Sequence, residues 1–160
     1  MTSRITALLV ASAAMASIAA GCGDSDGADD TTATVTTSSI SKAQFVKQAN
    51  SICDNGKASM TAELRNYEEE HGDISKGDAA VAAVKEVLRP SVQFQIEEIR
   101  SLGAPAGDAA EIEEFSTALL GAVDEIIRRE LTTIEQTQPL LRVAGDQALA
   151  YGIDDCAYGY

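Results

Sequence analysis

Apolar side chains recur at intervals of three and four residues along most of this sequence, and no segment shows the sustained alternation of a half-buried strand. This spacing places apolar residues on one face of a helix. It predicts long amphipathic helices over residues 41–70, 78–102 and 108–134, and a short fourth helix from Pro139 to Tyr151 with Gly152 as its left-handed cap. The chain is therefore expected to fold as an all-α domain.

Capping residues and prolines set the expected ends of these helices. Ser41 and Gln44 have the spacing of a capping box at the start of the first helix, and Asp108 and Glu111 repeat it at the start of the third. Pro90 lies inside the second helix, where a proline removes a hydrogen bond and clashes with the preceding turn. We therefore expect Pro90 to kink or break that helix.

The N-terminal 21 residues hold a single charged side chain, Arg4, followed by an unbroken run of apolar and small residues over 5–20. At about 1.5 Å per residue this run reaches roughly 24 Å as a helix, short of the ~30 Å core of a bilayer. A positive start, a short apolar middle and a small-residue end are typical of a secretory signal peptide. Residues 1–21 are assigned to a signal peptide and excluded from the fold.

Cys22 follows directly, in the stretch AAGC. This stretch resembles the lipobox of bacterial lipoproteins, with Ala19 where leucine is commonest. The resemblance implies that the Cys22 thiol receives a diacylglycerol, becomes the first mature residue and holds the protein in the lipid bilayer through acyl chains such as palmitate. Two or more chains anchor a protein stably, whereas one holds it reversibly. The alternatives are ordinary cleavage that leaves a free thiol, and an intermolecular disulfide.

Residues 23–39 contain four aspartates and five threonines but a single large apolar residue, Val35. A segment of this composition cannot form a core. We therefore expect a lipidated Cys22 and a flexible acidic, Thr-rich linker over residues 22–40. This linker tethers one helical domain over residues 41–160, a length that suits a single domain.

The chain is strongly acidic, with 25 acidic and 12 basic residues and a formal net charge of −13. Loss of Arg4 with the signal peptide makes the mature chain one unit more negative. Nucleic acid and anionic lipid headgroups are poor partners for such a surface. No nucleic-acid partner is expected.

Setting Cys22 aside leaves Cys53 and Cys156, an even pair in an exported protein, for which a disulfide is the expected state. The pair also bears on whether Pro139 kinks one long third helix or begins a reversed fourth. In an up-down-up-down bundle the last helix descends far enough to bring Cys156 level with Cys53. With three helices Cys156 would lie far beyond the end of the first. An antiparallel four-helix bundle closed by one disulfide is therefore expected.

Three segments carry a second resemblance: SKAQFVKQANSICDNG, LGAPAGDAAEIEEF and ALAYGIDDC. They are similar to a family of small actinobacterial lipoproteins and secreted envelope proteins that have an F-x-x-x-A-N-x-I-C opening, a Leu-x-x-Pro connection and a Y-G-L-x-x-C ending. The resemblance spans residues 41–156, with Ile153 in place of the usual leucine. It implies that Cys53 and Cys156 are paired, and it supplies no catalytic residues.

One pattern has metal-ligand spacing, Glu68-x-x-His71, which places both side chains on one helix face as in di-iron bundles. The glutamates available to complete such a site are Glu97, Glu98, Glu111 and Glu114. The sequence has a single histidine, and it closes a run of glutamates at a helix end, so a solvated helix end is the favoured interpretation. No nucleophile elbow, zinc-protease motif or phosphate loop occurs. No catalytic, metal-binding or cofactor-binding residue is predicted.

Two functions of different classes fit these features. The favoured one is a noncatalytic interaction module, anchored on the extracytoplasmic face of the cell membrane, whose partner is another envelope protein. The alternative is a small-ligand-binding bundle with an apolar pocket near Pro90 that accepts a hydrophobic or cationic molecule. A contiguous exposed apolar surface favours the first, and an enclosed cavity of several hundred Å³ favours the second.

Overall fold

The structure is a computed structural model that describes residues 40–159, and these residues are all-helical, with no strand among them. In chain order the elements are α1 (Lys42–His71), α2 (Gly77–Ala83), the π-helical turn η1 (Val84–Leu88), α3 (Arg89–Ser101), α4 (Ala109–Arg129), α5 (Ile134–Tyr151) and the 3₁₀ turn η2 (Asp154–Cys156). None of the described helices is both long enough and apolar enough to cross a membrane. The predicted signal peptide, Cys22 and the linker up to residue 39 lie outside the described residues.

α1 begins and ends where the sequence predicts. The Ser41 hydroxyl oxygen accepts a hydrogen bond from the Gln44 N–H, and Gln44 Oε1 accepts one from the Ser41 N–H, both at 3.3 Å. This capping box satisfies donors that the first turn of a helix leaves without partners. At the other end Gly72 has a φ of 83°, which glycine adopts without steric penalty, and the helix ends at His71.

Pro90 does not break the second helix. α2, η1 and α3 follow one another without a gap from Gly77 to Ser101. In η1 the Arg89 N–H donates to the Val84 carbonyl, one residue further back than in an α-helix. Because proline lacks an N–H and crowds the carbonyl four residues earlier, the helix widens in the turn just before Pro90. Of the predicted kink or break, the structure thus excludes the break.

The prediction that the third helix runs to Ile134 is wrong. α4 ends at Arg129, and Glu130 adopts the left-handed conformation with a φ of 55°. α5 begins at Ile134, where Thr133 and Gln136 form a capping box in which Gln136 Oε1 accepts from the Thr133 N–H at 3.3 Å. The stretch TTIEQ carries this start signal, and it decides the helix boundary although apolar spacing continues through it.

The fourth helix is longer than the short segment predicted to begin near Pro139. α5 has 18 residues and contains Pro139 in its interior. Proline at this position leaves the Glu135 carbonyl without its helical donor, but Glu135 lies in the exposed first turn, where water is available to it. The described chain thus has four long helical segments, which confirms the choice of four helices over three.

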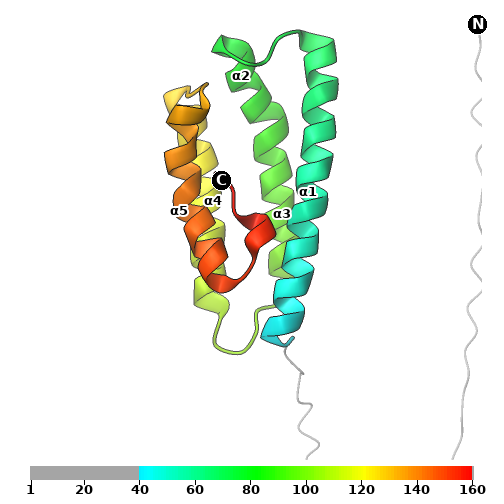
Figure 1. The fold of residues 1–160 in the computed structure, drawn as a ribbon, viewed down its shortest axis with the longest axis vertical. Helices are drawn as coiled ribbons and strands as arrows, with labels where there is room; N and C mark the ends of the chain where they lie inside the picture. Colours follow the sequence, from blue (N-terminus) through cyan, green and yellow to red (C-terminus); the bar gives the residue numbers. More distant parts are fainter. Residues whose placement is uncertain (1–39, 160) are drawn as a thin grey trace, which may run out of the picture. The chain divides into compact units, whose positions relative to one another are not determined.

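The long helices pack in two pairs. α1 packs against α3, α4 packs against α5, and α3 also contacts α4. Figure 1 shows α1 and α3 on one side and α4 and α5 on the other, with η2 between α1 and α5. α1 and α5 both contact η2, so the C-terminal segment links the two pairs on this side of the domain.

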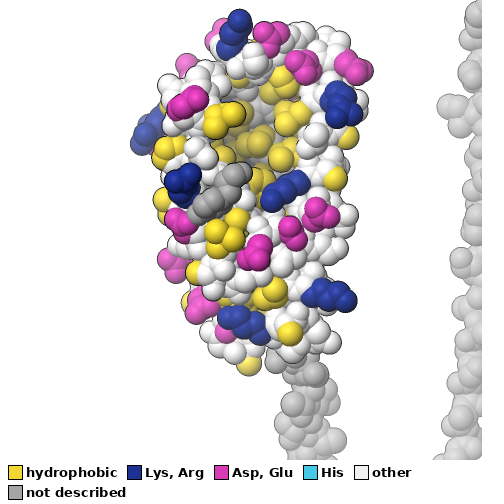
Figure 2. All heavy atoms as spheres, in the orientation of Figure 1, with side chains coloured by type: hydrophobic (Ala, Val, Ile, Leu, Met, Phe, Trp, Pro, Cys, Tyr) yellow, Lys and Arg dark blue, Asp and Glu magenta, His cyan; other side chains and the backbone are white. Residues whose placement is uncertain are grey.

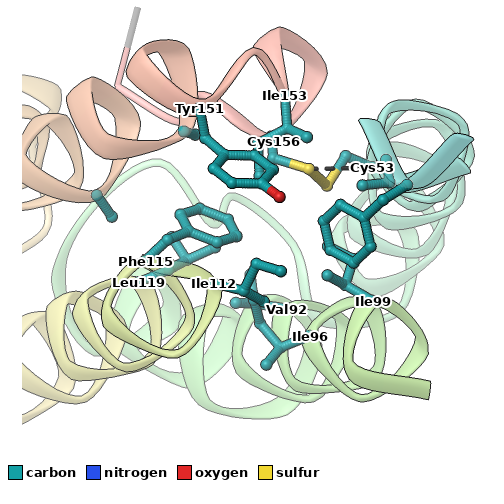
Figure 3. Packing of buried hydrophobic residues seen from close by; sticks show 14 of the residues in the cluster. Cys53, Val92, Ile96, Ile99, Ile112, Phe115, Leu119, Tyr151, Ile153 and Cys156 are labelled. Atoms are coloured by element: carbon teal, nitrogen blue, oxygen red, sulfur yellow. Dashed lines mark hydrogen bonds between the residues drawn. A yellow bond between two sulfur atoms is a disulfide. The ribbon is translucent and has the colours of Figure 1, made fainter. Parts of the chain in front are cut away.

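The largest fully buried side chains gather around the disulfide, at one end of the domain, and we call this end the closed half. Figure 3 shows side chains of α3, α4, α5 and the C-terminal segment converging beside the two linked sulfur atoms. The largest fully buried side chains are Phe45, Phe115, Ile96, Ile99, Leu119 and Ile153.

The other end, which we call the open half, contains α2, η1 and the part of α1 beyond Cys53. Phe45, Ala49 and Cys53 are the buried residues of α1, all in its first half. Met60, Leu64 and Tyr67 continue the helix face of Cys53 but remain partly exposed. Figure 2 shows a hollow between α1 and α5, above the C-terminal segment, with hydrophobic side chains inside it.

Candidate functional site

The opening and closing motifs of the second resemblance lie against each other in the structure. Cys53 and Cys156 form a disulfide with an S–S distance of 1.97 Å and a Cα–Cα distance of 5.1 Å. Asn50 holds the same chain end: its Nδ2 donates to the Gly152 carbonyl at 3.3 Å, and its Oδ1 accepts from the Asp155 N–H at 2.9 Å. One side chain of α1 therefore satisfies both ends of the turn that leads to Cys156.

The turn itself is formed locally. Gly152 has a φ of 97° and ends α5 in the left-handed conformation, as the sequence predicts. The Ile153 N–H donates back to the Ala148 carbonyl at 2.9 Å, and the Ile153 side chain is buried. The Phe45 and Tyr151 rings meet edge to face, with centroids 5.8 Å apart. The opening motif thus forms a binding surface on α1, and the closing motif is the chain end that packs against it.

Sequence reasoning missed the role of Asn50. The available signal is its place between Ala49 and Cys53, both of which are buried, on the side of α1 that faces the chain end. A polar residue beside two buried ones on a helix is a candidate partner for backbone groups that a nearby turn leaves unpaired.

Asp108 does not make the predicted side-chain cap of α4. Its Oδ2 instead accepts a hydrogen bond from the Tyr151 hydroxyl at 2.7 Å and lies 3.5 Å from Lys42 Nζ. Lys42 Nζ also lies 3.9 Å from the centroid of the Tyr151 ring. Burial and the Asp108 carboxylate raise the pKa of the Tyr151 hydroxyl above its ordinary value. These contacts join the starts of α1 and α4 to the end of α5, which makes them a structural cluster.

A pocket of about 500 Å³ lies between α1 and α3, at the position expected beside Pro90. We call it the Pro90 pocket. Its α1 side is one stripe of the helix, Ile52, Asn55, Gly56, Ser59 and Glu63, and its α3 side is Pro90, Ser91, Phe94, Gln95 and Glu98. It is open to solvent on one side and is therefore a cleft, whereas the sequence argument set an enclosed cavity as the sign of a ligand site.

Gln95 holds the floor of the Pro90 pocket in place. Its side chain is 2% exposed, Oε1 accepts from the Tyr158 hydroxyl at 2.7 Å, and Nε2 donates to the Ser91 carbonyl at 3.2 Å. Gly56 allows this arrangement, because a Cβ there would lie 2.1 Å from Gln95 Cδ. Burial raises the pKa of the Tyr158 hydroxyl, while its hydrogen bond to Gln95 opposes the shift.

The charges around the Pro90 pocket are of one sign. Glu63 and Glu98 line it, and no basic residue does. Ser59 donates a hydrogen bond to Glu63 Oε1 at 3.1 Å. The Phe94 side chain, also part of the lining, is 62% exposed, which is high for a large aromatic residue.

The residues weighed as metal ligands are not gathered into a site. His71 stacks on the Tyr67 ring with centroids 4.1 Å apart, at the end of α1. Glu114 Oε1 accepts from Gln147 Nε2 at 3.0 Å. Among residues 40–159 no group of three His, Cys, Asp or Glu side chains is placed to hold a metal ion.

Comparisons of this chain with family models, with curated proteins and with solved structures find no match.

Proposed function

We propose that this chain is a lipoprotein of the cell envelope, held on the extracytoplasmic face of the membrane by acylated Cys22, and that its helical domain is a noncatalytic module that binds another envelope protein. The AAGC stretch and the resemblance to small actinobacterial envelope proteins support the location. The observation that carries the interaction function is the hollow of the open half, where hydrophobic side chains face solvent between α1 and α5.

The proposal includes an antiparallel four-helix bundle as the architecture of the domain. Short connections support it: four to seven residues join α1 to α2, α3 to α4 and α4 to α5, over residues 72–76, 102–108 and 130–133. Helices joined by such short connections pack as antiparallel neighbours. In such a bundle each long helix needs two neighbours. In the open half α1 contacts α2 and η1, and its apolar face beyond Cys53 remains partly exposed.

The closed half indicates what a partner would do in the open half. η2 lies between α1 and α5 and buries the faces of both helices. Above η2 the same face of α1 continues through Met60, Leu64 and Tyr67, all partly exposed. An apolar segment of a partner protein would complete the open half as η2 completes the closed half.

Other exposed apolar side chains do not form a competing surface. The most exposed large hydrophobic residues are Phe94, Ile134, Val143 and Leu149, of which the last three lie on α5. Val143 is nine and six residues from the other two, which places it on a different face of that helix, and Ile134 and Leu149 are about 22 Å apart along the helix axis. Isolated apolar side chains of this kind are normal on protein surfaces.

The anchor is tested by Cys22→Ser in the expressed full-length protein. Because acylation at Cys22 is proposed to provide all the membrane attachment, the variant should appear in the medium or accumulate as an uncleaved precursor, as measured by fractionation and intact mass. The linker variant Ser25→Ala should stay in the membrane fraction. A processed Cys22→Ser protein that remained in the membrane fraction would contradict the proposal.

The interaction surface is tested by placing a photo-crosslinking amino acid at Leu64 in the anchored protein in cells. Leu64 lies on the apolar face of α1, and the exposed Glu69 lies on its opposite side and serves as the control position. Leu64 should give a discrete adduct of higher mass that Glu69 does not give. The same adducts at both positions, or none at Leu64, would exclude the open half as the docking surface.

Small-ligand binding is a second candidate function, and the Pro90 pocket is the observation that favours it. Its volume of about 500 Å³ falls within the range of roughly 300 to 1,000 Å³ typical of ligand sites. Like many such sites it combines apolar walls with a few polar groups. It uses a different pair of helices from the hollow, so the two functions are compatible in one domain.

A further inference from the structure

We propose that the Pro90 pocket binds a small organic cation, a protonated amine carried on an apolar body. This inference deepens the second candidate function and rests on it, and it is independent of any protein partner in the open half. Three features of the lining support it: an accessible apolar surface, charges of one sign, and a floor fixed by hydrogen bonds.

The apolar surface suits the body of such a ligand. Phe94 is 62% exposed and lies in the lining with Pro90 and Ile52. An apolar group placed against this ring would remove part of its surface from water, which is favourable in proportion to the area buried. An ammonium group over the ring face would gain a cation–π attraction as well.

The charges select a cation. Glu63 and Glu98 come from different helices, and the Glu98 carboxylate has no hydrogen-bond or ion-pair partner among the described residues. The basic residues next in sequence to the lining are engaged elsewhere: Lys57 lies over the Tyr158 ring at 5.3 Å, and Arg89 pairs with Asp124 at 3.3 Å. The chain's net charge of −13 adds long-range attraction for cations.

The floor is formed before a ligand arrives. Both polar atoms of the Gln95 amide are hydrogen-bonded, Oε1 to Tyr158 and Nε2 to Ser91, and the side chain packs so closely on Gly56 that a Cβ there would lie 2.1 Å from Gln95 Cδ. A site that needs no rearrangement loses less conformational entropy on binding. The uncharged amides of Asn55 and Gln95 complete the lining. They can hydrogen-bond polar groups of a ligand without favouring anions over cations.

The test compares three probes of nearly equal size: 2-phenylethylammonium, the neutral 2-phenylethanol and the anionic phenylacetate. Each is titrated into ¹⁵N-labelled full-length protein in nanodiscs, and amide chemical shifts of α1 and α3 are followed, including that of Gly56. We expect the ammonium probe to bind about ten-fold more tightly than 2-phenylethanol, because exposed carboxylates and an aromatic ring each contribute a factor of about two to five. Phenylacetate should produce no shifts at the pocket.

The double variant Glu63→Gln with Glu98→Gln should reduce the ammonium affinity about five-fold and leave the 2-phenylethanol affinity unchanged. The control pair Glu69→Gln with Glu97→Gln removes the same charge from the same two helices outside the lining, and it should have less than a two-fold effect. Phe94→Leu should weaken the ammonium probe more than the neutral one.

The outcomes separate the two claims. If the ammonium and neutral probes bind equally, or if the two glutamate pairs have equal effects, the preference for a cation is overturned while the pocket remains a ligand site. If no probe shifts the resonances of the pocket, ligand binding there is overturned together with this inference.

Discussion

The closed and open halves of the domain share α1 but differ in what lies between α1 and α5. In the closed half the chain end lies there, tied by a disulfide and two hydrogen bonds of Asn50, and the α1 face that carries Phe45 and Cys53 is buried. In the open half the same face of α1 is only partly covered: α1 contacts α2 and η1, and Met60, Leu64 and Tyr67 remain partly exposed. The difference shows that an amphipathic helix determines which face is apolar, whereas burial of that face depends on a second segment of chain.

The largest loss of stability should come from removing the disulfide that holds the chain end in the closed half. Replacing both cysteines, Cys53→Ala with Cys156→Ala, releases a cross-link between positions 103 residues apart. The free energy of unfolding should fall by about 4 to 5 kcal/mol in the chain-entropy model, measured by urea denaturation. That is a large share of the roughly 5 to 15 kcal/mol typical of a domain.

The far-ultraviolet helical signal of the folded double variant should stay close to that of the native protein, because the helices are stabilised by their capping hydrogen bonds and by packing of their apolar faces. Hydrogen exchange should accelerate first in η2 and at the end of α5. A stability loss below about 1 kcal/mol would mean that packing alone holds the chain end against α1.

A matched pair of truncations measures the difference between the halves directly. Ile99 is fully buried in the closed half, and Leu64 is partly exposed in the open half. Ile99→Ala should lower the free energy of unfolding by about 2 to 5 kcal/mol, because it removes buried methylene groups and leaves a cavity. Leu64→Ala should cost less than about 1 kcal/mol, as most partly exposed substitutions do.

Thermal and urea denaturation of both variants gives the comparison, with the native protein as reference. Equal losses would show that the open half is as well packed as the closed half, and the proposed docking surface would then lose its basis. Addition of a genuine partner should increase the cost of Leu64→Ala in a binding measurement while leaving that of Ile99→Ala unchanged.

The smallest effect, and a dependence on pH, should come from Tyr151→Phe. This change removes the hydrogen bond to Asp108, which should cost about 1 kcal/mol, less than the roughly 1.5 to 3 kcal/mol of a bond to a charged group because water reaches the Asp108 side chain. The pKa of Tyr151 is raised in the folded state, so the folded protein retains this proton more tightly than the unfolded chain does. Its contribution is therefore complete below pH about 10, the pKa of a free tyrosine, and declines as the pH rises further.

The free energy of unfolding of the native protein, measured by urea denaturation between pH 8 and 11, should accordingly fall more steeply above pH 10 than that of Tyr151→Phe. Parallel pH profiles for the two proteins would show that the Tyr151 hydroxyl is not a stabilising tie in the closed half.

Local sequence signals predicted the start and end of α1, the left-handed cap at Gly152 and the second helical stretch to within a residue or two. They were misread between residues 130 and 139, where apolar spacing continues through a connection. There the capping box of Thr133 and Gln136 outweighs periodicity, because it satisfies backbone donors within the first turn itself. Helix starts can thus be predicted from short patterns, and periodicity alone does not show where a helix ends.

The Pro90 pocket was predicted in position but not in composition. A proline inside a helix indicates where backbone geometry will be irregular, and the structure places the irregularity in η1. The lining depends on which stripe of α1 faces α3, and on that stripe Gly56 is in close contact with the Gln95 side chain. Such a contact joins residues 39 positions apart and leaves no local pattern.

By itself the sequence determined the helical class of the domain, its main caps and the two cysteines available for a bond, because hydrophobic period, capping and cysteine count are properties of short segments or of composition. The tertiary structure alone decided that Asp108 binds Tyr151 instead of capping α4, that Asn50 binds the turn before Cys156, and that the second half of the apolar face of α1 stays partly exposed. Each of these depends on which distant groups compete for the same polar atom or the same apolar surface. That competition is settled only when the helices pack.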